Sequence, residues 1–165
     1  MRILHATEAD ADRIFEIYNE ARAFMRESGN LTQWSGGYPG REVIEKDIAD
    51  GRLYKVCEDE DDAPIAVFYF GMGPDSTYAK IYEGEWLCPA REYGVIHRIA
   101  LSRGAHGRGV GRMCFDYCFG IIPNIRIDTH RDNRPMRSSL TKAGFSERGI
   151  IYLASGDERI AYQRV

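Results

Sequence analysis

The chain has 165 residues, which predicts one domain, residues 1–165, with a single substantial core. A hydrophobic content of 44% and a charged content of 28% are ordinary for a globular protein, and no run of 18 apolar residues predicts a membrane span. The net charge of −3 argues against a nucleic-acid-binding protein.

The first half of the chain predicts strands and helices joined by polar loops. The N-terminal residues lack the apolar region of a signal peptide, so we expect a cytoplasmic protein with no membrane partner. Thr7 is a candidate N-cap for the first helix, whose apolar face runs to Met25. Glycines and a proline mark a loop over residues 29–40. The other expected elements are strand 2–6, helix 41–49, strand 52–58 and strand 65–72.

The second half predicts a strand–helix–strand–helix sequence followed by a hairpin. Residues 73–92 have no clear period. Cys114 and Cys118 lie four residues apart on an expected helix, which indicates packing into the core; their spacing is not that of a zinc site, and we expect no metal. The expected elements are strand 93–102, helix 109–119, strand 125–130, helix 133–143 and a hairpin of strands 145–154 and 159–164. This order predicts a mixed α/β (α+β) fold.

The most distinctive stretch is "RGAHGRGVGR", residues 103–112. Glycine permits positive φ and a close approach of backbone to a ligand. The first turn of a helix offers unpaired N–H groups that favour anions, and flanking arginines add charge-assisted bonds. The stretch therefore predicts a phosphate cradle, with a helix-capping surface loop as the alternative.

Two familiar phosphate cradles fit this stretch poorly. A P-loop needs Lys-Ser or Lys-Thr after its last glycine, but Val110 and Gly111 follow Gly109. A dinucleotide fingerprint needs Gly-x-Gly-x-x-Gly, whereas the spacing here is Gly-x-Gly-x-Gly. The diphosphate of coenzyme A is the third candidate ligand for this cradle. Residues 1–90 carry 9 basic and 18 acidic side chains and residues 91–165 carry 13 and 7, which suits an anionic cofactor in the C-terminal part and a cationic substrate near the rest.

Residues 97–112 and 126–145 resemble the GNAT superfamily of N-acetyltransferases. The family's turn has Arg or Gln, then two residues, Gly, one residue, and Gly or Ala. Residues 106–111 follow this pattern, except that His106 stands at the first position. Asp128, Asn133, Gly144 and Phe145 stand at the family's next landmarks. The resemblance implies a mixed central sheet of about six or seven strands, flanked by about four helices, with a splayed strand pair that holds the cofactor.

The resemblance also implies acetyl-CoA as co-substrate, with its pyrophosphate on the backbone N–H groups of residues 107–112. A bulge near residues 99–101 would splay that strand from strand 125–130, so that the pantetheine arm pairs with the open edge. Asn133 would line the far side of the cofactor or cap its helix, two roles that do not exclude each other. The implied cofactor-binding residues are Ile99, Ala100, Leu101, His106, Gly107, Arg108, Gly109, Val110, Gly111, Arg112 and Asn133.

The chemistry of amine acetylation needs a proton acceptor. A lysine-like amine has a pKa near 10.4, so only about one in 2,500 is neutral at pH 7. His97 shares a strand face with Ile99 and is the candidate base, with a structural histidine as the alternative. A backbone N–H near Ala100 is the candidate donor to the thioester oxygen. Leu140 stands where many relatives have a tyrosine acid, which leaves Tyr152 or His130 as substitutes.

Aromatic residues of the irregular segments are candidates for the acceptor site. Aromatic walls with Glu85 would suit a cationic amine, and the alternative is that these rings only anchor long loops. The candidate substrate-binding residues are Trp34, Tyr38, Tyr82, Glu85, Trp86 and His130.

These features predict an acetyl-CoA-dependent N-acetyltransferase in which a primary amine of a small molecule, peptide or protein attacks the thioester directly. A non-catalytic acyl-CoA-binding sensor is the alternative that Leu140 keeps open and His97 opposes. An RNA-binding module would need a basic surface and exposed stacking aromatics. The identity of the amine and a homodimeric state stay open.

Overall fold

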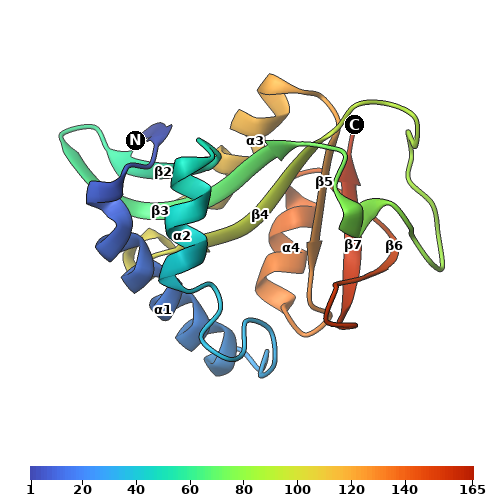
Figure 1. Ribbon diagram of the computed structural model, residues 1–165, viewed down its shortest axis with the longest axis horizontal. Helices are drawn as coiled ribbons and strands as arrows, with labels where there is room; N and C mark the ends of the chain where they lie inside the picture. Colours follow the sequence, from blue (N-terminus) through green and yellow to red (C-terminus); the bar gives the residue numbers. More distant parts are fainter.

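Seven strands form one sheet in the order β1-β2-β3-β4-β5-β7-β6 in the computed structural model, which describes residues 1–165 (Figure 1). Every neighbouring pair is antiparallel except β4 and β5, which are parallel. The strands are β1 Arg2–His5, β2 Leu53–Glu58, β3 Asp61–Met72, β4 Gly94–Leu101, β5 Ile125–Thr129, β6 Ser146–Tyr152 and β7 Glu158–Arg164.

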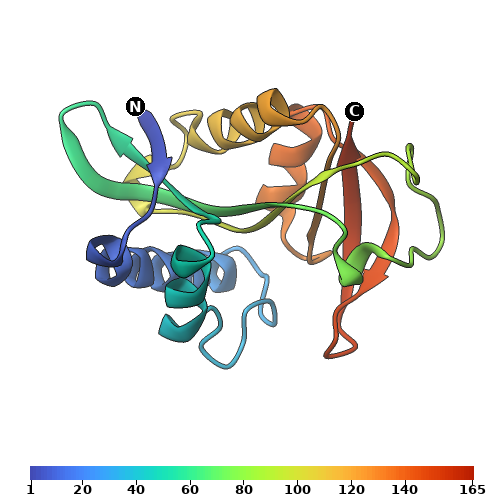
Figure 2. The ribbon, with the colours of Figure 1, turned by 45° about the horizontal axis from the view of Figure 1, so that its top comes forward.

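Four helices cover the two faces of the sheet. Helices α1 (Ala11–Glu27) and α2 (Arg41–Ala49) lie on one face, and α3 (Val110–Ile121) and α4 (Arg134–Lys142) lie on the other (Figure 2). The larger core cluster lies between α3, α4 and the sheet and contains Cys114 and Cys118, which confirms that these cysteines pack into the core. None of the helices combines the length and the apolar character that a membrane crossing needs.

The mixed sheet and the element order agree with the sequence expectation, and the differences are local. Strand β3 begins at Asp61 instead of Ile65, because Glu58 pairs with Asp61 and only two residues turn the hairpin. Thr7 begins a short 3₁₀ turn ahead of α1, and its backbone N–H donates to Asp10 Oδ2 at 2.8 Å. Asp10 in turn accepts a bond from Lys55 Nζ at 2.7 Å, so the entry to α1 is tied to β2.

Strands β4 and β5 separate soon after they meet. Their register contains only Gly94 opposite Ile125 and Val95 opposite Arg126, after which the strands diverge (Figure 1). On its other side β4 is bulged, since His97 pairs with Tyr69 but Ala100 pairs with Val67, which leaves residues 98 and 99 opposite one residue of β3. The bulge thus comprises Arg98, φ 50°, and Ile99, and it overlaps the start of the expected range of residues 99–101.

Candidate active site

Two adjoining cavities occupy the space that the splayed strands leave open. The turn cavity, about 340 Å³, lies beside the glycine turn between α1, β4, α3 and α4. The loop cavity, about 450 Å³, lies between the loop after α1 and strands β4, β5 and β7. Their common walls are Met25, Ile99, Asn133 and Met136. A ligand held along one cavity therefore meets a ligand in the other at these four side chains.

The backbone of the glycine turn presents an array of free donors to the turn cavity. Gly107 and Gly109 have φ values of 75° and 78°, in the left-handed region that glycine adopts without strain. The N–H groups of residues 107–112 have no acceptor in the protein, and the first bond of α3 runs from Met113 N to Gly109 O at 3.0 Å. Unpaired amides at a helix start form an anion site, which fits a diphosphate.

The arginines of the turn are engaged with surface carboxylates. Because such exposed pairs contribute only about 0–1 kcal/mol each, they exchange readily for an anionic ligand. Arg112 and His106 lie on the wall of the turn cavity, but Arg108, predicted to bind the cofactor, does not, since its side chain turns toward β2. The pairs are Arg103–Glu27, Arg108–Glu58 and Arg112–Asp116.

Strand β4 contributes Ile99 and Leu101 to the wall of the turn cavity, whereas Ala100 lines neither cavity. The side chain of Ala100 packs beneath α1 and α2, and Ala100 pairs with Val67. Ser102 N donates to Ile65 O on β3 at 2.9 Å, and by the two-residue alternation of a strand the N–H of Ala100 also points to β3. The N–H of Ala100 is therefore not free for the predicted donor role, whereas the N–H of Leu101 points toward the gap.

Helix α4 meets the cavities at its first turn. Asn133 caps the helix, with its Oδ1 accepting from Met136 N at 3.2 Å, while its Nδ2 donates to Gln33 Oε1 at 3.0 Å. Asn133 also lines both cavities, so its capping and lining positions coexist. Leu140, one turn on from Met136, is completely buried in the larger core and offers no acid to either cavity.

His97 lies on the wall of the loop cavity beside a carboxylate. Its Nε2 is 2.9 Å from Asp75 Oδ2, and its ring lies against those of Tyr69 and Tyr78. The hydrogen bond from His97 lowers the pKa of Asp75 to about 2, against the effect of burial, so the carboxyl is ionised and can only accept. Nε2 therefore carries the proton, and Nδ1 is left as the basic nitrogen.

Asp75 is a functional candidate that the sequence reasoning missed. It lies in the irregular segment after β3 and also caps a short 3₁₀ turn by accepting from Thr77 N at 2.8 Å. In the sequence it carries only the signal of a capping aspartate.

The loop after α1 contributes Trp34 and Tyr38 to the loop cavity, where the sequence reasoning places an acceptor. Tyr38 accepts a hydrogen bond from Arg98 Nη1 at 3.1 Å. Arg98 also forms two bonds to Asp47, at 2.9 and 3.0 Å, which hold its side chain across the bulge.

Four other predicted residues are not brought to either cavity, because residues 82–86 lie along the outside of β6 and Tyr152 is an exposed residue of β6 itself. A Cβ on Gly84 would lie 1.9 Å from Arg148 O, which shows how closely this loop follows the strand. Tyr82 and Tyr152 pack edge to face at 5.3 Å and are exposed. Glu85 is exposed, and Trp86 is buried against Tyr78. These placements correct the substrate roles of Tyr82, Glu85 and Trp86 and the acid role of Tyr152.

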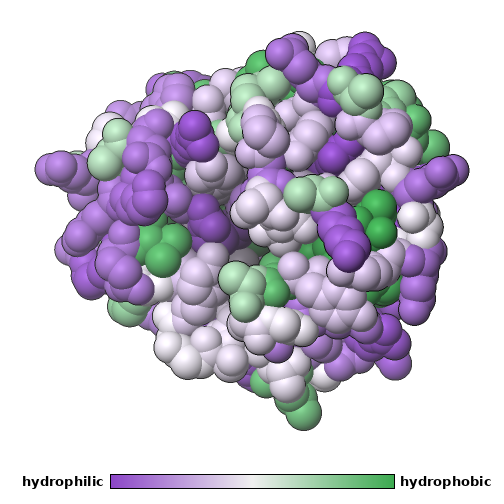
Figure 3. All heavy atoms as spheres, turned by 45° about the vertical axis from the view of Figure 1, so that its right-hand side comes forward, coloured by the Kyte–Doolittle hydropathy of each residue, from purple (hydrophilic) through white to green (hydrophobic).

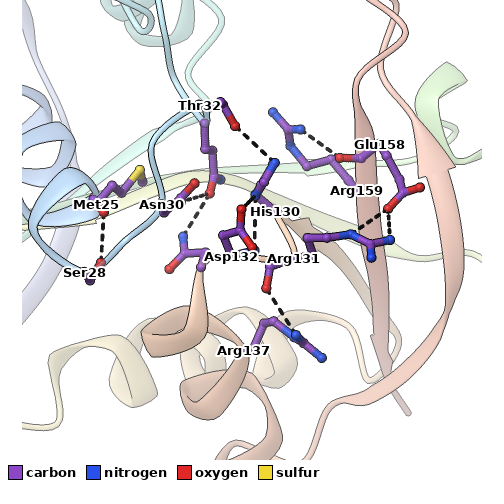
Figure 4. A network of polar contacts seen from close by, with 12 residues as sticks. Met25, Ser28, Asn30, Thr32, His130, Arg131, Asp132, Arg137, Glu158 and Arg159 are labelled. Carbon is purple, nitrogen blue, oxygen red and sulfur yellow. Dashed lines mark hydrogen bonds and ion pairs between the residues drawn. The ribbon is translucent and has the colours of Figure 1, made fainter.

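His130 borders a third, polar cavity that shares walls with the loop cavity (Figure 4). Its Nδ1 accepts from Asp132 N at 3.1 Å, so the proton of the neutral ring is on Nε2, which lies 3.2 Å from Thr32 Oγ1. Burial and the nearby Arg159 lower the pKa of His130, so the ring is neutral at pH 7. His130 therefore lines the polar cavity as a neutral, hydrogen-bonded side chain.

The splayed strand pair, the cradle at the start of α3 and the two joined cavities form one continuous candidate site. No family model and no curated protein matches the sequence. A GNAT-family acetyltransferase from Streptococcus agalactiae matches at 33% identity and a TM-score of 0.89, over 99% of this chain and 94% of that one. The chain therefore belongs to the GNAT family, and it is an acetyltransferase.

More distant structures share the fold. The NatC complex bound to Gag peptide and CoA matches at 13% identity and a TM-score of 0.65, over 99% of this chain and 98% of that one. A ribosomal-protein-alanine N-acetyltransferase from Brucella melitensis matches at 17% identity and a TM-score of 0.66, over 100% of this chain and 99% of that one.

Proposed function

We propose that this acetyltransferase takes its acetyl group from acetyl-CoA and transfers it to a primary amine. The observation that carries the proposal is the junction at Ile99 and Met136, where a cavity that ends in unpaired amides meets a cavity that bears His97. A structural neighbour described as CoA-bound and another described as a ribosomal-protein-alanine N-acetyltransferase support the same donor and an amine acceptor.

The turn cavity suits the donor. The amides of residues 107–112 bind its diphosphate, and mostly apolar walls accommodate the pantetheine arm along the open edge of β4. The N–H of Leu101 supplies a hydrogen bond for a carbonyl oxygen at the junction, where developing negative charge needs a donor.

The His97–Asp75 pair suits the acceptor. An amine must lose a proton to become a nucleophile, and Nδ1 of His97 receives it directly or through one water. Asp75 fixes the ring tautomer through Nε2 and stabilises the positive charge that the ring gains. The attacking nitrogen loses a second proton to water as the amide forms, and the imidazole returns the first proton to bulk water.

The departing thiolate needs no tyrosine acid in this account. A thiol pKa near 8.5 makes thiolate a fair leaving group, and the position of Leu140 is sealed in the core. Tyr152→Phe should therefore leave kcat and its alkaline pH limb unchanged. A steady-state pH profile that loses its alkaline limb in this variant would show that Tyr152 supplies a proton after all.

The proposal is tested by incubating the purified protein with acetyl-CoA and a panel of amines, amino acids and peptides, with CoA release and product mass as readouts. We expect release that depends on the amine and a product heavier by one acetyl group. Tight acyl-CoA binding with no turnover on any acceptor would instead support a sensor.

Asp75→Asn tests the role of the carboxylate beside His97. Loss of the orienting anion should lower kcat/KM by about 10²-fold with little change in acetyl-CoA affinity. The native pKa of Asp75 is about 2, below its ordinary 3.8, so its stabilising effect is present above pH 3.8 and is lost as pH falls toward 2. Between pH 3.8 and about pH 2, the melting temperature of the variant should therefore fall less than that of the wild-type protein. Equal acid sensitivity of both proteins would contradict the assigned pair.

A further inference from the structure

Arg159 on β7 is a buried cation that no anion of the protein neutralises. Only 7% of the residue is exposed, and its one hydrogen bond runs from Nη1 to the carbonyl of Glu158 at 2.9 Å. It forms no ion pair, and no aromatic ring lies against its guanidinium. A buried charge without a partner is costly, so an anion that completes the site is expected from outside the chain.

The other buried cations of the molecule show the contrast. Each is compensated by a carboxylate or by aromatic faces, so the isolation of Arg159 is not a general feature of this fold. The buried groups are Lys55, paired with Asp10 at 2.7 Å, and Arg126, held against the rings of Trp86 and Tyr93 at 4.3 and 3.7 Å. The half-buried Arg98 is likewise paired, with Asp47 at 2.8 Å.

The Arg159 side chain faces the loop cavity. Its neighbour Ile160 points into the core beneath α3 and α4, so Arg159 lies on the opposite face of the sheet. Arg159 lines both the loop cavity and the polar cavity, and Figure 4 shows it extending from β7 toward His130 and Thr32. Its effect on the pKa of His130 is a second sign of this closeness.

The loop cavity has unpaired positive charge on one side and carboxylates near His97 on the other. Asp75 is bonded to His97, and Asp128, which accepts from Tyr78 Oη at 2.7 Å, lies on the wall contributed by the neighbouring β5. Arg159 supplies positive charge on the β7 side. Asp157, the acid nearest to it in sequence on the same wall, accepts from Ser155 Oγ at 2.8 Å and forms no pair with Arg159.

We propose that the acceptor is a small amino acid-like molecule, whose amine meets His97 and whose carboxylate is bound by Arg159. This inference rests on the proposed function. A guanidinium presents paired N–H donors that match a carboxylate, and charge-assisted bonds of this kind are strong. The cavity of about 450 Å³ is of ordinary size for a small-molecule site. Figure 3 shows a largely hydrophilic face on which some apolar side chains gather around a central hollow.

The test compares three acceptors that share one side chain: an α-amino acid, its primary amide and the decarboxylated amine. We expect kcat/KM of the wild-type protein to be about 10–100-fold higher for the amino acid than for the other two. Arg159→Met should abolish this preference through a raised KM, and Arg159→Lys should restore part of it. Arg148→Met is the control, since Arg148 donates to Glu85 O outside the cavity, and it should keep the preference.

Thermal unfolding gives a readout that does not depend on turnover. Arg159→Met removes an uncompensated buried charge, so its melting temperature should match or exceed that of the wild type, and a high concentration of the amino acid should stabilise only the wild type. Equal kcat/KM for the three acceptors, or a preference that survives Arg159→Met, would overturn the inference. If the proposed function itself is wrong, the result is distinguishable, because CoA is then released with none of the three acceptors.

Discussion

His97→Gln should lower kcat/KM by about 10²–10⁴-fold, because glutamine keeps a polar side chain of similar reach but cannot accept a proton near neutrality. The acidic limb of the pH–rate profile should disappear with the imidazole. Acetyl-CoA affinity should barely change, since His97 lies on the loop cavity and not on the turn cavity. The measurement is steady-state kinetics across pH with a responsive amine, together with calorimetric titration of acetyl-CoA.

The matched control for this variant is Tyr69→Phe. The Tyr69 ring lies against His97, and its hydroxyl bonds only outward, to Arg52. This change should preserve both activity and the acidic limb. Full activity and an unchanged acidic limb in His97→Gln would make His97 structural and assign proton removal to another group.

Gly111→Asp should weaken CoA binding by about 10²-fold or more, because it places a carboxylate among the amides that we propose bind the diphosphate. The site accepts a side chain, since the nearest heavy atom to a Cβ there is Ser139 Oγ at 3.8 Å. An acidic residue in the first turn of a helix also favours folding, so the variant should stay stable. Calorimetry measures the affinity, and thermal unfolding checks the fold.

Two controls separate charge from bulk. Gly111→Asn adds the same volume without charge and should retain most of the affinity, while Gly120→Asp adds the charge at the far end of α3, where nothing lies within 4 Å, and should bind normally. Arg108→Glu should weaken binding less than Gly111→Asp, since the Arg108 side chain turns toward Glu58. Unchanged CoA affinity in a folded Gly111→Asp protein would remove the diphosphate from this turn.

The fold was largely predictable because its signals are local. Helix α2 has the expected bounds of residues 41–49, and Gly51 follows it with a φ of 66°, as a glycine after a helix end often does. The glycine turn could be predicted for the same reason, since left-handed glycines at a helix start depend on few neighbours. The start of β3 at Asp61, ahead of the expected residue 65, was not predictable locally, because it depends on the pairing of its tight hairpin with β2.

The site was less predictable because it depends on contacts between distant segments. The amide direction of Ala100 follows from its register with β3, and the burial of Trp86 follows from the course of a long loop. Asp75 meets His97 across 22 positions of sequence. The isolation of Arg159 is a property of the whole fold, because it consists in the lack of an ion pair with any acid, including the neighbouring Asp157 and Glu158, which no local pattern reports.

The most direct test of a donor cavity and an acceptor cavity that meet at Ile99 is a crystal structure with a bisubstrate analogue, in which the sulfur of CoA is joined to an amine through an acetyl bridge. The account predicts the diphosphate on the amides of residues 107–112, the bridging carbonyl beside Leu101 N, and the amine facing His97. A diphosphate bound away from this turn, or an amine directed away from the loop cavity, would contradict it.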